Sequence, residues 1–372
     1  MHVAAILLGL ALLWIVLRDA FETMVLPRSI TRRLRPTRIY FINLWWGYRA
    51  FVRMMRSHGA RERWLGAFGP FSLIGLIIVW ATALIFGYAL TIWGIGSPFY
   101  MPPREPHSIW SDIYETGTTF FTASFGDIEP RTGLARFLAV AEAGTGLGFL
   151  AIVIGYFPVL YQSFSRREAG ISRLDARAGS PPSAVELLRR HAEAGRMAAL
   201  APLLEEWERW AADVLESHLS YPVLAYYRSQ HDRESWLAAL TAILDACALI
   251  AMGFEGDPEW QQALKWQAQM TFAMARHTMV DLSLVLRVDP RLGADRMGPE
   301  DLESIRLLLR TAGVDLKADA EAVGRLNGLR RQYEPFLDAL GDRLWLDLPV
   351  WSPRAVTADN WQVSAWDLRK HL

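Results

Sequence analysis

Residues 118–130 combine hydroxyl, carboxylate and glycine residues in a pattern suited to binding a small ion. Their sequence is Thr-Thr-Phe-Phe-Thr-Ala-Ser-Phe-Gly-Asp-Ile-Glu-Pro. This run lies between two apolar runs that are long enough to cross a bilayer. Irregular backbone is tolerated at membrane depth only where it is buried in protein or lines water. There, a ring of backbone carbonyls can replace the water shell of a cation. The chemistry indicated is cation binding along a path through the membrane.

Three apolar segments are long enough to position this run as membrane spans, because about 20 apolar residues cross the hydrocarbon core. They cover residues 2–17, with a helical pattern that continues to residue 26, residues 71–95 and residues 134–164. Residues 109–122 are too short and too rich in threonine to cross, and they suit a pore helix. No basic segment precedes the first apolar run and residues 18–22 make a poor cleavage site, so we expect a membrane helix there rather than a signal peptide.

The two halves of the chain differ in composition, although the whole carries 39 basic and 39 acidic side chains. Residues 1–169 hold 16 Arg, no Lys and 10 acids, which leaves 23 bases and 29 acids for residues 170–372. The second half has no run long enough to span. We therefore expect four parts: a first transmembrane helix at residues 1–26, an Arg-rich loop at 27–68, a pore domain at 69–169 and a cytoplasmic helical domain at 170–372.

Arginine counts set the expected orientation, because cytoplasmic loops carry an excess of Lys and Arg. Residues 27–68 hold ten Arg and one acid, whereas residues 96–133 hold two Arg and five acids. We expect the Arg-rich loop and the C-terminal domain inside, and the N-terminus and the pore loop outside. Aromatic and basic residues at helical spacing over residues 40–56 suit an amphipathic helix, lying either on the inner membrane face or against the C-terminal half.

Residues 122–127, Thr-Ala-Ser-Phe-Gly-Asp, resemble the selectivity filter of the potassium channel family, which usually reads Thr-Val-Gly-Tyr-Gly-Asp. Pro130 completes the Gly-Asp-x-x-Pro signature of that family. Residues 18–28 resemble the end of the first helix in bacterial channel-like proteins of the two-helix pore superfamily. The resemblance implies ion binding by the Thr122 hydroxyl and carbonyl and by the carbonyls of Ala123, Ser124 and Phe125, a backbone turn at Gly126, and Asp127 at the outer mouth.

The same resemblance implies an assembly and a function. One pore loop per chain implies four chains around one axis, so we expect a homotetramer in contact with membrane lipids. Its expected function is passive conduction of potassium across a membrane, with the bacterial inner membrane as the expected location. Potassium ions in the filter, or other monovalent cations, are the expected ions, and no cofactor is implied.

Ser124 departs from the family pattern, which has glycine at that position because one filter residue takes a backbone angle that is costly for a residue with a Cβ atom. A left-handed conformation costs a non-glycine residue about 1 to 2 kcal/mol, and the cost recurs in each subunit. A strained or reshaped filter would select poorly, so a weakly selective cation channel is one alternative. A membrane sensor or scaffold that has a pore-like fold but does not conduct is the other.

Two residues of the third span are further candidates. The Glu142 carboxylate lies within an apolar helix, where such groups are rare and face protein or water. We expect it to hydrogen-bond the pore helix near Thr118 or Tyr114; the alternative is a ring of four copies that concentrates cations in the cavity. Gly146 lies where the resemblance places a hinge glycine, and close helix packing is an equal alternative to a hinge.

The second half reads as helices, with apolar residues at helical spacing and Pro or Gly between segments. We expect them at residues 184–219, split at Pro202, and at 235–251, 260–286, 299–312 and 314–340. No alternating strand series precedes Leu344, so neither a nucleotide-binding gating domain nor a cyclic-nucleotide β-roll is expected. A Pro-broken tail that we expect to dock on the helical domain or on a neighbour holds Trp345, Trp351, Trp361 and Trp366.

No Ser-His-Asp, metal-ligand or phosphate-loop arrangement is visible in the sequence. We therefore expect no enzymatic activity, no catalytic residues and no metal site. No basic stripe indicates nucleic-acid binding. The expected fold class is an all-α membrane protein with three transmembrane helices and one re-entrant pore loop, plus a cytoplasmic helical domain that sets assembly or gating.

Overall fold

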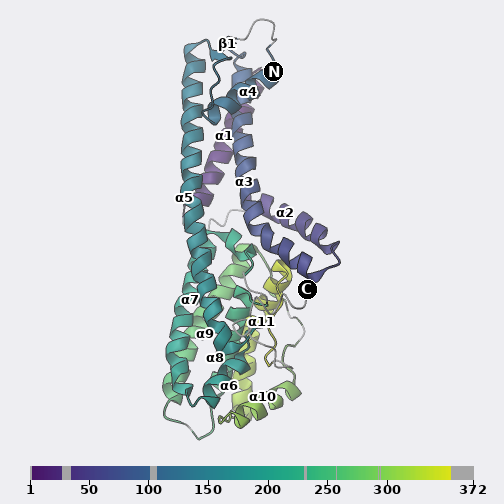
Figure 1. The fold of residues 1–372 in the computed structure, drawn as a ribbon, viewed down its shortest axis with the longest axis vertical. Helices are drawn as coiled ribbons and strands as arrows, with labels where there is room; N and C mark the ends of the chain where they lie inside the picture. The colour runs from purple at the N-terminus through teal and green to yellow at the C-terminus, as the bar shows by residue number, and fades with distance from the viewer. Residues whose placement is uncertain are drawn as a thin grey trace, which may run out of the picture. The chain divides into compact units, whose positions relative to one another are not determined.

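The chain folds into helices that belong to two compact units, Met1–Tyr161 and Gln162–Leu372 (Figure 1). The computed structural model describes residues 2–26, 35–100, 107–229, 233–256, 258–291, 293 and 295–352. The start of the predicted Arg-rich loop, residues 27–34, lies outside the described residues, as does the end of the tail.

Three long apolar helices dominate the N-terminal unit. Its elements are α1 His2–Met24, α2 Pro36–Arg53, α3 His58–Gly94, β1 Phe99–Tyr100, α4 Ile109–Phe120, β2 Glu129–Pro130 and the part of α5 Gly133–Ala178 up to Tyr161. By length and composition α1, α3 and α5 can each cross a membrane, which confirms the three predicted spans and the all-α membrane fold.

Two of these helices are longer than their apolar runs. The helix α3 begins at His58, where the Ser57 side chain caps it, and not at the start of its apolar run at residue 71. The helix α5 continues to Ala178, so residues 165–169, where the composition changes, are helical. The domain boundary predicted there stays a prediction.

Small residues let α1 approach α3 closely. A Cβ atom on Gly9 would lie 2.4 Å from the Thr91 Oγ1 atom, and a Cβ on Gly94 would lie 2.5 Å from the Ile6 Cγ1 atom. Close backbone approach at small residues is a common way for membrane helices to pack. The first span therefore rests on the second along its length.

Asp19 ties α1 to both α2 and α3. Its buried carboxylate accepts hydrogen bonds from the Thr37 N–H (3.0 Å), the Thr37 hydroxyl (2.5 Å) and the Trp80 indole N–H (3.0 Å). Because Thr37 lies in the first turn of α2, the carboxylate also interacts favourably with the positive end of that helix. This fixes where α2 begins within the predicted Arg-rich loop.

The predicted amphipathic helix is present as α2, and one face of it packs on α3. Trp45 and Val52 are buried, and the Trp45 and Phe68 rings meet edge to face at 4.7 Å. The opposite face leaves Trp46 59% exposed and Ile39 48% exposed. An exposed aromatic face of this kind suits a lipid interface, and its placement on the membrane stays a prediction.

The C-terminal unit is helical, as predicted. It contains α6 Ala184–Glu193, η1 Met197–Ala199, α7 Leu200–Ser220, η2 Pro222–Tyr226, α8 Trp236–Met252, α9 Gln261–Leu286, α10 Pro299–Thr311 and α11 Ala320–Leu344. The short apolar helix α8 forms its core, with nearly every residue buried, and packs against α9 and α11.

The predicted break at Pro202 is wrong. The helix interruption falls at Gly195, which has a left-handed φ of +62°, and α7 then starts at Leu200. Pro202 lies in the first turn of α7, where a backbone N–H has no partner within the helix and its absence costs little. Gly195, just after the end of α6, therefore ends that helix, and Pro202 does not interrupt α7.

The last helix also starts later than residue 314. Residues 314–317 pair with the loop after α8 instead: Phe254 and Leu316 form an antiparallel bridge, and the Lys317 N–H donates to the Gly253 carbonyl at 2.9 Å. The helix α11 begins only after Asp319, whose side chain caps it by accepting from the Ala322 N–H at 2.8 Å.

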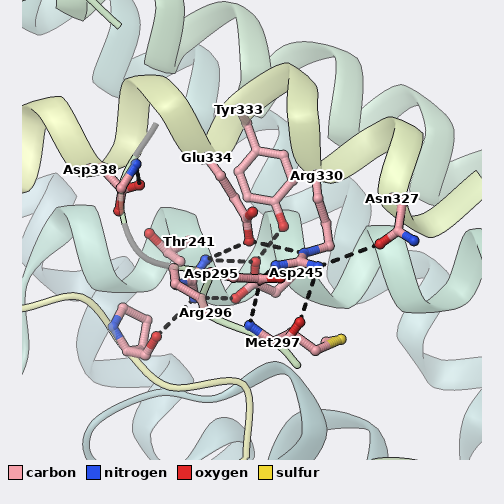
Figure 2. A network of polar contacts seen from close by, with 12 residues as sticks. Thr241, Asp245, Asp295, Arg296, Met297, Asn327, Arg330, Tyr333, Glu334 and Asp338 are labelled. Atoms are coloured by element: carbon pink, nitrogen blue, oxygen red, sulfur yellow. Dashed lines mark hydrogen bonds and ion pairs between the residues drawn. The ribbon is translucent and has the colours of Figure 1, made fainter. Parts of the chain in front are cut away.

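A buried polar network holds α8, α11 and the chain between α9 and α10 together (Figure 2). Asp245 is 1% exposed, accepts from the Tyr333 hydroxyl at 2.5 Å, and pairs with Arg296 at 2.7 Å. Arg296 and Arg330 both lie over the Trp351 ring, each with its guanidinium carbon 5.6 Å from the ring centroid. The expectation that the tail docks on the helical domain is confirmed for Trp351, which is 2% exposed.

His218 of α7 is buried beside a guanidinium. Its Nδ1 atom lies 2.8 Å from the Val214 carbonyl and its Nε2 atom lies 3.2 Å from Arg167 Nη1, so the neutral tautomer donates from Nδ1 and accepts at Nε2. Burial, and then the positive charge of Arg167, lower the pKa of His218 well below its ordinary value of 6.5. This histidine is therefore neutral in the folded protein.

We expect this histidine to make the protein less stable in acid. Between the lowered folded pKa of His218 and its ordinary value of 6.5, the unfolded chain binds more protons, so the free energy of unfolding rises with pH. Stability should be full above pH 6.5 and fall as the pH drops below it. Chemical unfolding across pH 5–8 measures this. His218→Gln should flatten the acid slope and the exposed control His277→Gln should not; equal slopes in all three proteins would refute the assignment.

Candidate functional site

The candidate site begins with α4, the predicted pore helix, which covers Ile109–Phe120 rather than 109–122. Its start is fixed by a capping box, in which the Ser108 hydroxyl accepts from the Ser111 N–H at 3.2 Å and the Ser111 hydroxyl accepts from the Ser108 N–H at 2.9 Å. The Ser97 hydroxyl donates to the Asp112 carboxylate at 2.7 Å. These contacts join the first turn of α4 to the chain that follows α3.

The threonines of α4 satisfy their hydroxyls within the helix. Thr116 donates to the Asp112 carbonyl (2.8 Å), Thr118 to the Glu115 carbonyl (2.9 Å) and Thr119 to the Glu115 carboxylate (2.9 Å). Buried hydroxyls need partners, and a carbonyl three or four residues earlier is the nearest acceptor on a helix. A threonine-rich helix can thus bury a polar face next to the loop it supports.

The loop after α4 folds its N–H groups back onto the end of that helix. Three donate to α4 carbonyls: Thr122 to Thr119 at 3.0 Å, and Ala123 and Ser124 to Thr118 at 2.7 and 3.3 Å. In a trans peptide the preceding carbonyl points opposite to the N–H group. The carbonyls of Phe121, Thr122 and Ala123 therefore point away from α4, on the exposed side of the loop.

Every second residue of the loop has a left-handed backbone angle. The φ values are +56° at Thr122, +33° at Ser124 and +77° at Gly126. Glycine takes such an angle freely, whereas a residue with a Cβ atom is strained there, and a β-branched threonine especially so. The sequence indicated the strain at Ser124 and the turn at Gly126. It gave no signal for the strain at Thr122, because threonine is the usual residue of the similar family at that position.

We expect Ser124→Gly to relieve part of this strain. Removing the Cβ at a φ of +33° should stabilise the loop by about 1 kcal/mol in each chain. The measurement is the midpoint of thermal unfolding in detergent, with Ser304→Gly, on the exposed face of α10, as the control that should lower it. A midpoint for Ser124→Gly at or below that of the wild type would show that Ser124 is not a strained position.

The chain after the loop is clamped by a small sheet. Phe99 pairs with Pro130 and Tyr100 with Glu129 in the antiparallel strands β1 and β2. Ile128 is buried in a cluster with Phe99. The loop itself stays exposed in the single chain from residue 121 to residue 127, which includes the Asp127 side chain. The loop is thus held at both ends and open on one side.

Gly146 is the point at which α5 meets the end of α4. A Cβ atom on Gly146 would lie 1.9 Å from the Phe120 carbonyl oxygen and 2.8 Å from the carbonyl carbon. No real Cβ comes so close to a backbone atom, so only glycine fits. This geometry favours the packing alternative for Gly146 over the hinge.

Glu142 lies one turn before Gly146 on α5 and is fully buried. Neither of its carboxylate oxygens has a hydrogen-bond partner. The expected hydrogen bond to Thr118 or Tyr114 is therefore not formed within one chain. The sequence did not single out its acidic neighbour Glu115 of α4, which is 5% exposed and close enough for the two charges to interact.

An apolar hollow lies beside the loop. It has a volume of about 280 Å³. Its lining comes from α3, α4 and α5 and includes Phe121, Thr122, Gly146 and Leu147. Over the described part of the chain, no three His, Cys, Asp or Glu side chains are grouped so that they could hold a metal ion.

Comparison with known proteins points to the same segment. Residues 73–162 match the family model described as ion channel. Over 214 residues the chain is 24% identical to an uncharacterized membrane protein, YdjJ, of Bacillus subtilis, an alignment that covers 56% of this chain and 59% of that protein. The chain thus spans about three fifths of the curated relative's length. No solved structure gave a significant match.

The match covers most of α3, all of α4 and the loop, and the part of α5 that contains Glu142 and Gly146. With three helices that can span a bilayer, the chain is an integral membrane protein whose residues 73–162 are similar to the ion channel family.

Proposed function

We propose that the chain is one subunit of a homotetrameric channel that conducts potassium passively in preference to sodium. The observation that carries this proposal is the direction of the loop backbone: its N–H groups turn to α4, so its carbonyls face the open side. A carbonyl row of this kind replaces the water of a dehydrated cation. The ion-channel match over residues 73–162 supports the same function, and a channel needs no catalytic group.

A tetramer is supported by the surfaces that one chain leaves open. One loop presents one row of oxygens, whereas a dehydrated ion needs oxygens from all sides. Phe121 and Phe125 are 66% and 72% exposed beside that row. Within the chain, only 11% of the most apolar 18-residue segment of α5 is buried. Neighbouring subunits and lipid would cover these apolar surfaces.

The residue roles combine this geometry, which covers the carbonyls of Thr122 and Ala123, with the resemblance to the potassium channel filter, which supplies the others. The Thr122 hydroxyl and the carbonyls of Thr122, Ala123, Ser124 and Phe125 would bind the ion, Gly126 would end the row with a turn, and Asp127 would attract cations at the outer mouth. Glu142 and Gly146 would support the filter from behind, at the contact between α5 and α4. The C-terminal unit would set assembly or gating.

The proposed setting is the bacterial inner membrane, with the N-terminus and the loop outside and the C-terminal unit in the cytoplasm. The arginine count supports this orientation, since residues 27–68 hold ten Arg and one acid. Cysteine reagents that cannot cross the membrane test it. A cysteine placed at Asp127 in a Cys247→Ser background should react from outside, and one placed at Glu205 only after the membrane is opened.

The reversal potential of the purified protein in a planar bilayer tests the function, with potassium on one side and sodium on the other. A potential well toward the potassium equilibrium value is the expected result. Thr122→Ala should move it toward zero, and Thr311→Ala, at an exposed threonine of α10, should not. A clear current that reverses near zero in the wild type would favour the weakly selective channel, which the strain at Thr122 and Ser124 makes the second candidate. An assembled tetramer that stays silent across voltages and pH values would favour the non-conducting sensor.

A further inference from the structure

Two buried carboxyl groups lie on helices that touch each other at Gly146, one on α4 and one on α5. Glu142 is 0% exposed and Glu115 is 5% exposed. Both oxygens of Glu142 and the Oε2 atom of Glu115 lack a hydrogen-bond partner, whereas Glu115 Oε1 accepts from the Thr119 hydroxyl at 2.9 Å. The charges of the two groups would act on each other if both were ionised.

Two ionised carboxylates cannot stay there without a neutralising partner. An isolated buried carboxylate costs many kcal/mol, and a second negative charge beside it adds to that cost. A metal ion is not supported, because no third acidic, histidine or cysteine ligand joins the pair within the described residues. A proton needs only one carboxylate oxygen, and Glu142 offers two that are unpartnered.

Among the described residues, the groups that act on this pair add no positive charge. Tyr88 of α3 lies near Glu142 and shares a hydrogen bond with Thr145 at 2.9 Å. Asp112 and Asp127 both interact with Glu115 and are acidic, and His107 acts on Asp112 rather than on the pair. The described groups near the pair therefore offer it no counter-charge.

We propose that Glu142 and Glu115 form a proton-binding site that makes conduction depend on pH. Glu142 lies one turn before Gly146, whose Cα face contacts the Phe120 carbonyl at the base of the loop. With the proton bound, α5 rests on α4 and supports the loop. Loss of the proton places two negative charges in the contact, drives the helices apart, and lowers the current.

Infrared spectroscopy of the purified protein tests proton binding without any need for conduction, so a failure here is distinct from a failure of the proposed channel function. A carbonyl band of a buried protonated carboxylic acid is expected in the wild type and should disappear in Glu142→Gln. Glu129→Gln, at an exposed site of β2, should keep the band. Persistence of the band in Glu142→Gln, or its absence from the wild type, would overturn the proposal.

The titration of that band tests the pairing. Glu115→Gln removes the neighbouring negative charge, so the midpoint at which the band is lost should move to lower pH by about one unit or more. An unchanged midpoint would show that the two groups do not act as one site. Because glutamine is neutral and of the same shape, both variants should assemble, which their elution volume checks.

The current–pH relation tests the coupling and rests on the proposed function. The wild-type current should fall as the pH rises through the infrared midpoint. Glu142→Gln should conduct at all pH values, at the level that the wild type reaches in acid. A wild-type pH dependence retained in Glu142→Gln would overturn the coupling.

Discussion

Gly146→Ala is expected to remove most of the potassium flux through the assembled channel. The added Cβ atom would lie 1.9 Å from the Phe120 carbonyl oxygen, whereas ordinary contacts lie at about 3.5 Å or more. Backbone atoms cannot rotate out of the way, so α5 and the end of α4 must separate by roughly 1 Å or more. The Phe120 carbonyl lies two residues before Thr122, and the separation therefore reaches the first ion-binding residue of the loop.

The measurement is thallium or rubidium flux into vesicles that contain equal amounts of tetramer. Gly144→Ala and Gly148→Ala are matched controls on the same helix, because a Cβ at either position has no atom within 4 Å in the chain. They should conduct like the wild type. Packing also predicts a lower unfolding midpoint for Gly146→Ala, whereas a hinge predicts altered gating at unchanged stability. Wild-type flux and stability in Gly146→Ala would contradict both roles.

Arg296→Leu is expected to lower the free energy of unfolding by about 3–5 kcal/mol, the usual cost of leaving a buried charge unpaired. Arg296 is the cation that pairs with Asp245 at 2.7 Å, and Asp245 is 1% exposed (Figure 2). Without it, Asp245 keeps only the Tyr333 hydroxyl, which cannot balance a full charge. The variant also loses the Arg296 guanidinium, one of the two that lie over the Trp351 ring.

Denaturant unfolding of the full chain in detergent, followed by tryptophan fluorescence, measures this effect. Arg209→Leu is the matched control, because Arg209 and its partner Glu205 are 68% and 53% exposed on α7. Exposed pairs contribute at most about 1 kcal/mol, so the control should unfold almost like the wild type. Equal midpoints for the two variants would show that the buried network does not hold the C-terminal unit together.

The sequence was sufficient for the features that depend on local pattern. Three apolar runs predicted three spans, and a threonine-rich run of about three turns predicted the short helix before the loop. Helical spacing likewise predicted most helices of the C-terminal unit. Such features depend on residues that are near neighbours in the chain, so the spacing of apolar and polar residues along the sequence is enough to predict them.

Two errors in the predicted helix boundaries have different causes: in one a contact distant in sequence overrides the local pattern, and in the other one local signal outweighs another. Residues 314–317 have a helical pattern, yet Leu316 pairs with Phe254, which lies 62 residues earlier, so the local pattern cannot show this pairing. The break between α6 and α7 falls at Gly195 rather than at Pro202, since a proline in the first helical turn is harmless.

Of the candidate site, the sequence by itself determined which residues form the loop, because their types and spacing are local. Only the tertiary structure decided how those residues are held. It buried Glu142 and Glu115, brought Gly146 so close to the Phe120 carbonyl that a Cβ would lie 1.9 Å from its oxygen, and gave Thr122 a left-handed angle. Each outcome depends on how α4 and α5 meet, and residues far apart in the chain make that contact.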